Sequence, residues 1–312
     1  MKALTFCSSI ALSLAALSTN VLAQKYFTSR GQEIPDGETT MQGTNLAWRT
    51  KEASTGKDRI VNVPATDVIR LDFPTPTDLQ EAETALNRGD AATALAKADP
   101  VSKRFEAFKT TPGSYYLSAT LVKLEALALL KKAEDFDKLK TTLKAVSLNP
   151  ADSVRLAAAD AVLDFAKGII GPAETAIVAN LAKTDDASVL ARLHNFLGDV
   201  RTKMGNFKGA LEAYLSVSVL YGSQADQLPR AELGAARSLI KMQYLDDANN
   251  MLLGLRERFP TSPQAEAAKA ELAELTKIIG DVRTQKAEAD EAAAKAQAPP
   301  TAPESTTPPA PK

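Results

Sequence analysis

The chain contains 312 residues, of which 45% are hydrophobic and 24% are charged, proportions typical of a soluble globular protein. Its formal net charge of −1 gives no global attraction for nucleic acid or an anionic membrane, so composition argues against both as partners. Aromatic residues make up only 5%, while Ala and Leu dominate long stretches, which favours packed helices over an aromatic-rich sheet core.

Residues 1–23 are typical of a secretory signal peptide. Lys2 supplies a positive charge, an apolar run extends from Leu4 to Leu17, and Val21-Leu22-Ala23 forms a small-residue cleavage pattern. A membrane anchor is the alternative, and it is disfavoured because serines interrupt a short run. We therefore expect an exported protein, periplasmic or extracellular, with no membrane insertion after cleavage. The only cysteine, Cys7, lies within this segment, so the mature chain would contain no disulfide.

Residues 24–74 predict a small antiparallel β module of three to five strands. The segments LAW (46–48), RIVNV (59–63) and DVIRLDF (67–73) alternate apolar and polar positions and are separated by glycines and Pro64. In this pattern Ile69, Leu71 and Phe73 share one face. Trp48 is expected to fill the core of the module.

Residues 75–283 show helical periodicity, interrupted by turn sequences such as NRGD (87–90), TPG (111–113) and GP (171–172). The last helix begins near Pro263 and carries an apolar stripe from Ala265 to Val282 at intervals of three and four. Residues 284–312 begin as an Ala/Glu-rich helix extension and end in a Pro-rich segment. We expect that segment to be disordered because it has no large apolar residues with which to build a core.

The stretch FLGDVRTKMGNFKGALEAYLSV (196–217) places small residues where two antiparallel helices would cross. It contains a Leu-Gly pair ending at Gly198, a turn at Gly205, an aromatic at Phe207, a small residue at Ala210 and an aromatic at Tyr214. This arrangement resembles the tetratricopeptide repeat family. Similar half-repeats occur elsewhere, with Ala248 at the small position and Pro260 at the end of one of them.

The resemblance implies a mainly α fold, an α-α superhelical solenoid of tetratricopeptide-like helical hairpins, preceded by the small antiparallel β module. Other helical solenoids share similar spacing and remain the alternative. In the family, the first helices of the repeats line a concave groove that receives peptides. Carried over to this chain, that groove comprises Arg192, Asn195, Asp199, Lys203, Arg230, Leu233, Arg237 and Lys241.

Five of these eight groove residues are basic, which would attract an acidic peptide segment through charge-assisted hydrogen bonds. The alternative is that they form a solvated helix face. We interpret the partner as another protein, and we expect neither nucleic acid nor a cofactor.

Catalytic chemistry has little support in the sequence. His194 is the only histidine, so catalytic triads have a single candidate base and the usual His-rich zinc sites are not available. Ser54 and Lys57 have a Ser-x-x-Lys spacing but lie between predicted strands, where a hairpin turn is the better interpretation. We expect no catalytic, metal or cofactor residues, and therefore no enzyme.

Three functions remain open. The leading one is an exported, non-enzymatic protein-interaction scaffold of the bacterial cell envelope. The second is a polysaccharide or peptidoglycan-binding module that uses the β module, for which Tyr26, Phe27 and Trp48 are the candidate stacking residues. The third is a hydrolase that uses carboxylates alone, which would require two converging acids with raised pKa values.

The cleavage pattern leads to the first testable prediction. The secreted protein should begin at Gln24, because signal peptidase cleaves after small residues such as Ala23. N-terminal sequencing and intact mass of the exported form measure this. Recovery of residues 1–23 on a membrane-bound form would contradict it.

Overall fold

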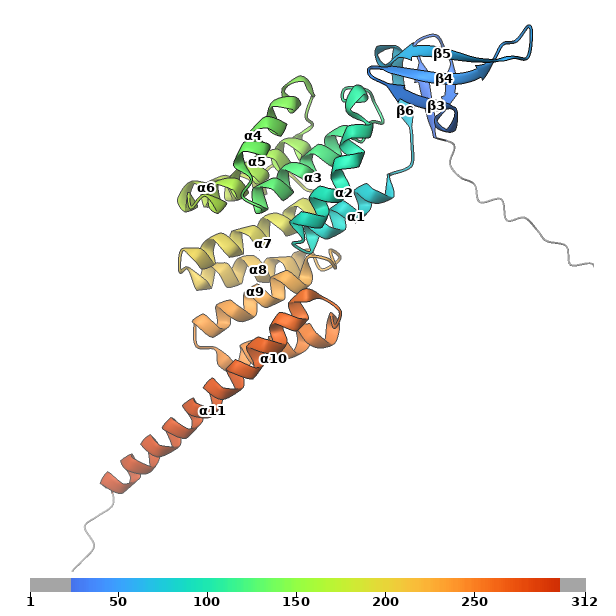
Figure 1. The fold of residues 1–312 in the computed structure, drawn as a ribbon. Coiled ribbons are helices and arrows are strands. Elements are labelled where there is room, and N and C mark those ends of the chain that lie inside the picture. The colour runs from blue at the N-terminus through green and yellow to red at the C-terminus, as the bar shows by residue number, and fades with distance from the viewer. Residues whose placement is uncertain (1–23, 298–312) are drawn as a thin grey trace, which may run out of the picture. The chain divides into compact units, whose positions relative to one another are not determined.

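A computed structural model describes residues 24–297, without the side chains of residues 281–283 and 291–297 (Figure 1). The expected signal peptide, the Pro-rich end of the chain and the side chain of Val282 therefore lie outside the described residues. Six short strands come first and eleven α-helices follow them along this part of the chain. None of these helices combines the length and apolarity that crossing a membrane requires.

The chain forms two compact units. Unit 1 comprises the described residues up to Ala82 together with Ala96–Thr120 and Thr141–Ser147. Unit 2 comprises Glu83–Leu95, Leu121–Lys140 and the chain from Leu148 onward. The change from strands to helices near residue 74 therefore does not coincide with the division between the units.

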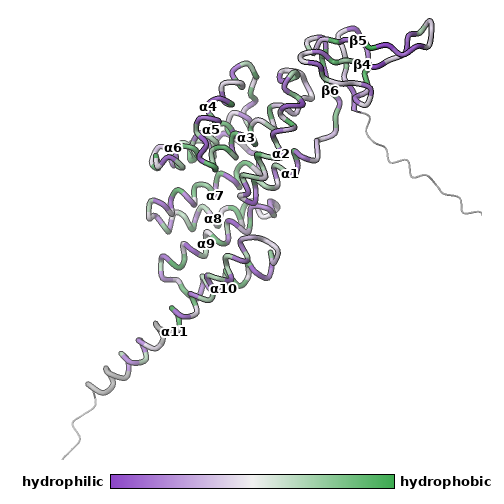
Figure 2. The backbone as a smooth tube through the Cα atoms, in the orientation of Figure 1, coloured by the Kyte–Doolittle hydropathy of each residue, from purple (hydrophilic) through white to green (hydrophobic). Residues whose placement is uncertain are grey.

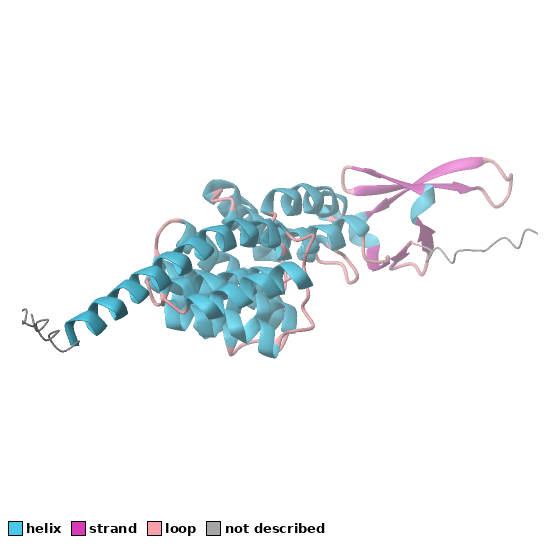
Figure 3. Cartoon of the chain, turned by 90° about the horizontal axis from the view of Figure 1, so that it is seen from below, coloured by secondary structure: helices cyan, strands magenta, loops and turns pink. Residues whose placement is uncertain are grey.

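The strands of unit 1 form two antiparallel three-stranded sheets. One has the order β2-β1-β6 and the other the order β3-β4-β5. Strands β4 and β5 continue past the end of β3 as a two-stranded arm (Figure 3). The strand bounds are β1 Lys25–Thr28, β2 Glu33–Pro35, β3 Thr39–Gln42, β4 Asn45–Lys51, β5 Asp58–Pro64 and β6 Val68–Asp72.

The core of unit 1 combines aliphatic residues of the sheets with an aromatic cluster. Ile34 and Leu46 are fully buried. Tyr26 packs edge-on against Phe73 at a centroid distance of 5.1 Å and lies 5.5 Å from Phe108. Aromatic pairs at such distances and tilted geometries are favourable beyond the area that they bury.

Three expectations for the β module are wrong. Six strands form rather than three to five, because β1 to β3 are short and partly polar and so lack the alternation that identifies a strand. Trp48 is only half-buried, and its indole Nε1 donates to Glu38 Oε2 at 3.1 Å. Ile69 is 55% exposed, because a register shift between Phe27 and Thr28 pairs Thr28 with Val68 and places Val68 in the core instead.

The helices begin and end where local signals place them. Asn149 Oδ1 accepts from the backbone N–H of Asp152 at 2.8 Å, and Asp186 and Asn206 cap later helices in the same way. The predicted break at Gly171-Pro172 is displaced, since both residues lie in the first turn of a helix, where proline is tolerated. The bounds are α1 Thr77–Asn87, α2 Ala91–Arg104, α3 Tyr116–Leu129, α4 Ala133–Thr142, α5 Pro150–Ala166, α6 Ile170–Leu181, α7 Ala187–Lys203, α8 Phe207–Leu220, α9 Leu228–Lys241, α10 Leu245–Arg258 and α11 Pro263–Gln297.

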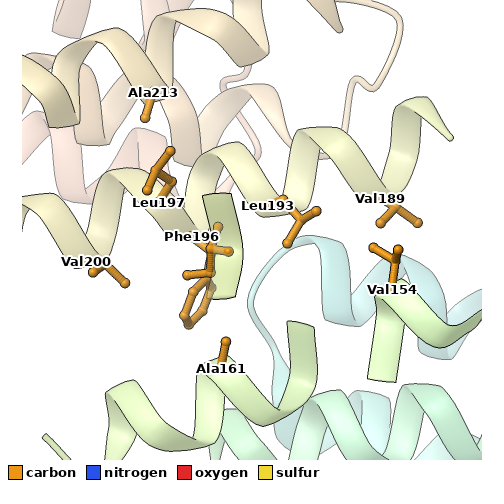
Figure 4. Packing of buried hydrophobic residues seen from close by; sticks show 9 residues of the cluster. Val154, Ala161, Val189, Leu193, Phe196, Leu197, Val200 and Ala213 are labelled. Carbon is orange, nitrogen blue, oxygen red and sulfur yellow. The ribbon is translucent and has the colours of Figure 1, made fainter. Parts of the chain in front are cut away.

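From α5 to α11, each helix of unit 2 packs against the next one along the chain, and α7, α8 and α9 lie as successive layers (Figure 1). Hydrophobic residues recur along each of these helices between hydrophilic ones (Figure 2). One core cluster joins α5, α6, α7 and α8; in it Phe196 of α7 points toward Ala161 of α5, and Val189 faces Val154 (Figure 4). The fold is thus the expected mainly α solenoid of stacked helical hairpins with a small antiparallel β module before it.

Tyr214 of α8 is wedged between two glycines of the neighbouring helices. A Cβ atom at Gly198 of α7, or at Gly234 of α9, would lie within 3.0 Å of the Tyr214 ring. Ala210, one turn earlier on α8, is fully buried in the same cluster as Tyr214 and Ala235. Three consecutive helices can approach this closely only because small residues surround the ring.

The last helix closes the stack on one side. Ala265, Ala268, Leu272 and Leu275 are buried, the last three in one cluster with residues of α9 and α10, which confirms this part of the apolar stripe. Residues 284–290 are exposed, and the final turns of α11 show little hydrophobic colour (Figure 2). Residues 284–290 therefore contribute no side chain to the core.

The tyrosine wedge provides a stability test. Gly198→Ala and Gly234→Ala should each lower the free energy of unfolding by about 1–3 kcal/mol, because the added methyl group overpacks the Tyr214 ring. Gly254→Ala is the matched control, because its Cβ would meet nothing closer than Arg258 Nη2 at 3.6 Å. The higher helix propensity of alanine should raise the free energy of unfolding of this variant by up to about 1 kcal/mol. Urea titration followed by circular dichroism measures all three. Unchanged midpoints for both wedge variants would refute the wedge.

Candidate functional site

The inner side chains of unit 2 surround three adjoining hollows that share Leu129 and Arg230. The buried hollow, of about 50 Å³, is lined by apolar side chains and by Arg155, Arg192 and Glu125. The tyrosine hollow, of about 460 Å³, adjoins Tyr214 and Arg237. The lysine hollow, of about 500 Å³, is lined by Leu129, Lys131, Val162, Phe165, Ala166, Lys167, Gly168, Ile170, Phe196, Asp199, Lys203 and Arg230. Together they make the candidate functional site.

Four charged side chains join α1, α3, α5 and α7 beside the buried hollow. Arg155 lies 2.8 Å from Glu125 and 3.1 Å from Glu83, and Arg192 lies 3.2 Å from Glu83 and 3.7 Å from Glu125. Arg155 and Glu125 are each only 13% exposed. Each cation contacts both anions, so the cluster is electrically balanced.

The charges of this cluster depend on one another. Burial alone would raise the pKa of Glu83, but Arg155 and Arg192 outweigh it and hold that pKa below its ordinary value of 4.5. Burial likewise acts to lower the pKa of Arg155, and the carboxylates of Glu125 and Glu83 raise it above its usual range. Glu83 and Arg155 therefore stay ionised at neutral pH, and the cluster links α1, α3, α5 and α7.

A second polar cluster lies where the tyrosine and lysine hollows meet. Asp199 Oδ1 accepts from the Tyr214 hydroxyl at 2.7 Å, and its other oxygen pairs with Arg230 of α9. Burial, followed by the negative charge of Asp199, raises the pKa of the Tyr214 hydroxyl, so it remains a hydrogen-bond donor. This cluster links α7, α8 and α9 at the hydroxyl end of the same Tyr214 ring that lies between the two glycines.

The eight predicted groove residues fall into three groups. Arg192, Asp199, Arg230 and Arg237 line the hollows but are held in ion pairs, Arg237 with Glu271 of α11. Asn195 and Leu233 are buried, and Asn195 Nδ2 donates to Gln227 Oε1 at 3.0 Å, so Asn195 contributes to packing. Lys203 and Lys241 are exposed. Three of the five basic residues of the predicted stripe, Arg192, Arg230 and Arg237, are therefore engaged in ion pairs.

The repeat-packing residues have equally distinct environments. Gly198, Ala210, Tyr214 and Ala248 are buried, and Gly205 adopts a φ of 78° in the turn between α7 and α8, a conformation that favours glycine. Phe207 is half-buried at the start of α8, and Pro260 is exposed beyond the end of α10.

Sequence reasoning missed the partners of the cations and the rim of the lysine hollow. Glu83, Glu125 and Arg155 all lie before the best-defined hairpin of the repeat pattern, so nothing in their spacing identified them. Lys131 and Lys167 had a detectable signal: with Lys203 and Lys241, each stands at or just beyond the end of the first helix of a hairpin. Cations are favourable there because they face the negative end of the helix dipole.

The candidates for sugar stacking on the β module are mostly covered. Tyr26 is buried and donates to Asp36 Oδ1 at 2.7 Å, and the Arg70 guanidinium lies 4.1 Å from the centre of the Phe27 ring. Trp48 is half-buried. A flat exposed aromatic platform, which sugar rings require for stacking, does not form from these three residues.

Among the described residues, no cluster of three or more His, Cys, Asp or Glu side chains is placed to hold a metal ion. His194 stacks at 5.6 Å from Tyr221, and burial and then Arg201 lower its pKa. His194 therefore packs against an aromatic ring of the loop that follows α8.

The similarity to known proteins lies in the fold. The chain is similar to the crystal structure of the apo form of RapI, a helical repeat protein, with a TM-score of 0.51 and 15% sequence identity. The alignment covers 65% of this chain and 60% of that chain, so it spans less than two thirds of RapI. No family model and no curated protein matches the sequence. The comparison supports a helical repeat architecture.

The buried charge cluster leads to a second stability prediction. Arg155→Met should destabilise the protein by about 3–5 kcal/mol, because Glu83 and Glu125 would each lose a buried counter-ion. Arg88→Met is the control, since the Arg88–Asp226 pair is 58% and 40% exposed and should be worth less than about 1 kcal/mol. Thermal and urea unfolding at pH 7 measure both. Equal losses for the two variants would show that the cluster contributes no more than a surface pair.

Proposed function

We propose that the protein is a non-enzymatic protein-interaction scaffold whose repeats are of the tetratricopeptide type. The observation that carries the proposal is the inner surface of unit 2. There, α3, α5, α7 and α9 present two adjoining hollows of about 460 and 500 Å³, within the range of about 300–1,000 Å³ typical of ligand sites. A segment of another protein can lie across both hollows.

The rigidity of this surface supports a role in recognition. The Glu83–Arg155–Glu125–Arg192 cluster, the Asp199–Arg230 pair and the Arg237–Glu271 pair connect the inner helices one to the next. A preformed surface binds with a smaller loss of conformational entropy than one that must order on binding.

The tetratricopeptide assignment rests on the spacing of small and aromatic residues. Gly198, Ala210 and Tyr214 occupy the crossing of α7 and α8, and Ala248 occupies the corresponding buried position of the next hairpin. These contacts are the ones that the family pattern requires.

We place the scaffold outside the cytoplasm, in the periplasm or the extracellular space of a bacterium. The support is the charged, apolar and small-residue pattern of residues 1–23. In that setting the partner is another protein of the cell envelope, and we expect its contacting segment to be acidic, because the exposed side chains at the inner edge of unit 2 include several lysines.

Site-specific photo-crosslinking tests the scaffold function. A benzoylphenylalanine in place of Arg237, which lines the tyrosine hollow and is 54% exposed, should crosslink to a protein partner in living cells. The matched control replaces Val219 of α8, which is 76% exposed and lines none of the three hollows. The captured protein is then purified and its Kd measured.

The two positions separate the possible outcomes. The proposal requires a partner captured from position 237 and not from position 219, with direct binding confirmed for the purified proteins. Crosslinks from position 219 alone would move the interaction to the outer helices and overturn the inner-face site.

A further inference from the structure

The two larger hollows differ in how their cations are neutralised. The three arginines of the tyrosine hollow, Arg88, Arg230 and Arg237, each pair with a carboxylate. Among the described residues, no carboxylate lies within ion-pair distance of Lys131, Lys167 or Lys203, and all three are exposed on the rim of the lysine hollow. Its only acidic lining residue, Asp199, is engaged by Arg230 and Tyr214. Unmatched positive charge is therefore concentrated at the lysine hollow.

The floor of the lysine hollow is apolar and aromatic. Phe165 packs edge-on against Phe196 at a centroid distance of 5.7 Å, and Leu129, Val162 and Ile170 complete the apolar lining. The residues next along the chain from the rim extend this character outward, since Ile169 is 45% exposed and Met204 is 50% exposed. An apolar floor below a ring of lysines suits a ligand that is apolar in the middle and anionic at its edges.

We propose that the lysine hollow is the anchoring site of the partner, and that it takes an acidic peptide segment carrying an aliphatic or aromatic side chain. The apolar side chain enters the hollow between Phe165 and Ile170, and carboxylates on either side pair with Lys131, Lys167 and Lys203. This inference rests on the proposed scaffold function and gives it a chemical specificity. It also assigns the charged contact with the partner to the lysines at the helix ends instead of the arginines of the inner face.

Charge complementarity selects this occupant over the alternatives. A neutral apolar peptide would leave three lysines without counter-ions, and a purely acidic peptide would leave the apolar floor in contact with water. The buried hollow, at about 50 Å³, is too small for a large side chain, and its charges are already balanced. The lysine hollow alone combines volume, apolar surface and unmatched charge among the three.

A peptide selection tests the chemistry of the ligand. The mature full-length chain is used to select binders from a library of random nine-residue peptides. The proposal expects enrichment of Asp and Glu around a central Leu, Ile, Phe or Tyr. Selected peptides without acidic residues would overturn it, as would a chain that selects none but binds phosphatidylglycerol vesicles through the same lysines.

Variants then locate the site with the best selected peptide as the probe. The triple substitution Lys131→Gln, Lys167→Gln and Lys203→Gln should weaken binding by about tenfold or more and flatten its dependence on salt concentration. The control triple, Lys269→Gln, Lys277→Gln and Lys286→Gln, removes the same charge from exposed positions of α11 and should leave both unchanged. Equal affinities of the two triple variants would overturn the site.

A separate substitution tests the apolar floor without removing any core side chain. Ala166→Trp places an indole in the lysine hollow that Ala166 lines, and it should abolish binding of the same peptide while thermal unfolding stays cooperative. Wild-type affinity in a folded Ala166→Trp variant would show that the hollow is not occupied.

Failure of this inference is distinguishable from failure of the scaffold function. If position 237 crosslinks to a partner whose affinity is unchanged by the lysine triple, the scaffold stands and the lysine hollow is not its anchor. If position 237 captures nothing and the library yields no dependence on the lysines, both proposals fall.

Discussion

The stack of helices in unit 2 depends on the Tyr214 ring, which fills the space between Gly198 and Gly234. A ring of this size between two helices is possible only where neither helix carries a side chain, because a single Cβ atom would overlap it. The ring sets the spacing of α7, α8 and α9, and its hydroxyl directs Asp199 toward Arg230. Packing and polar contacts are thereby fixed at the same point, at the meeting of the two larger hollows.

Charge is distributed over this framework in two ways. Arginines of α5, α7 and α9 pair with carboxylates on neighbouring helices, four cations with four anions, so they link the stack and leave little net charge. Lysines occupy the exposed ends of the first helices, where the helix dipole favours them and where Lys131, Lys167 and Lys203 remain unmatched. Guanidinium groups suit the first role because their planar donors satisfy two carboxylates at once. The paired arginines thus link neighbouring helices, and the unpaired lysines carry the charge that we propose contacts the partner.

The β module forms its core together with residues from a helical segment further along the chain. Its aromatic core joins Tyr26 and Phe73 to Phe105 and Phe108, residues that follow α1 by many positions, so unit 1 is built from separated segments. A boundary drawn at the change in secondary structure could not anticipate this, because the helices α1 to α4 contribute residues to both units. Long-range hydrophobic contacts decided the division.

The sequence alone determined the class of fold and the register of the best-defined hairpins. Small residues at Gly198, Ala210 and Ala248, and the turn at Gly205, follow from the steric requirements of helices in close contact, which are local and leave a recurring pattern. The pattern also marked the basic residues of the groove. It could not show which of them are neutralised, since Glu83 and Glu125 are distant along the chain from Arg192, and an ion pair depends on distance in space. Only the tertiary structure decided that the arginines stabilise the stack and that the unmatched charge lies at the lysine hollow.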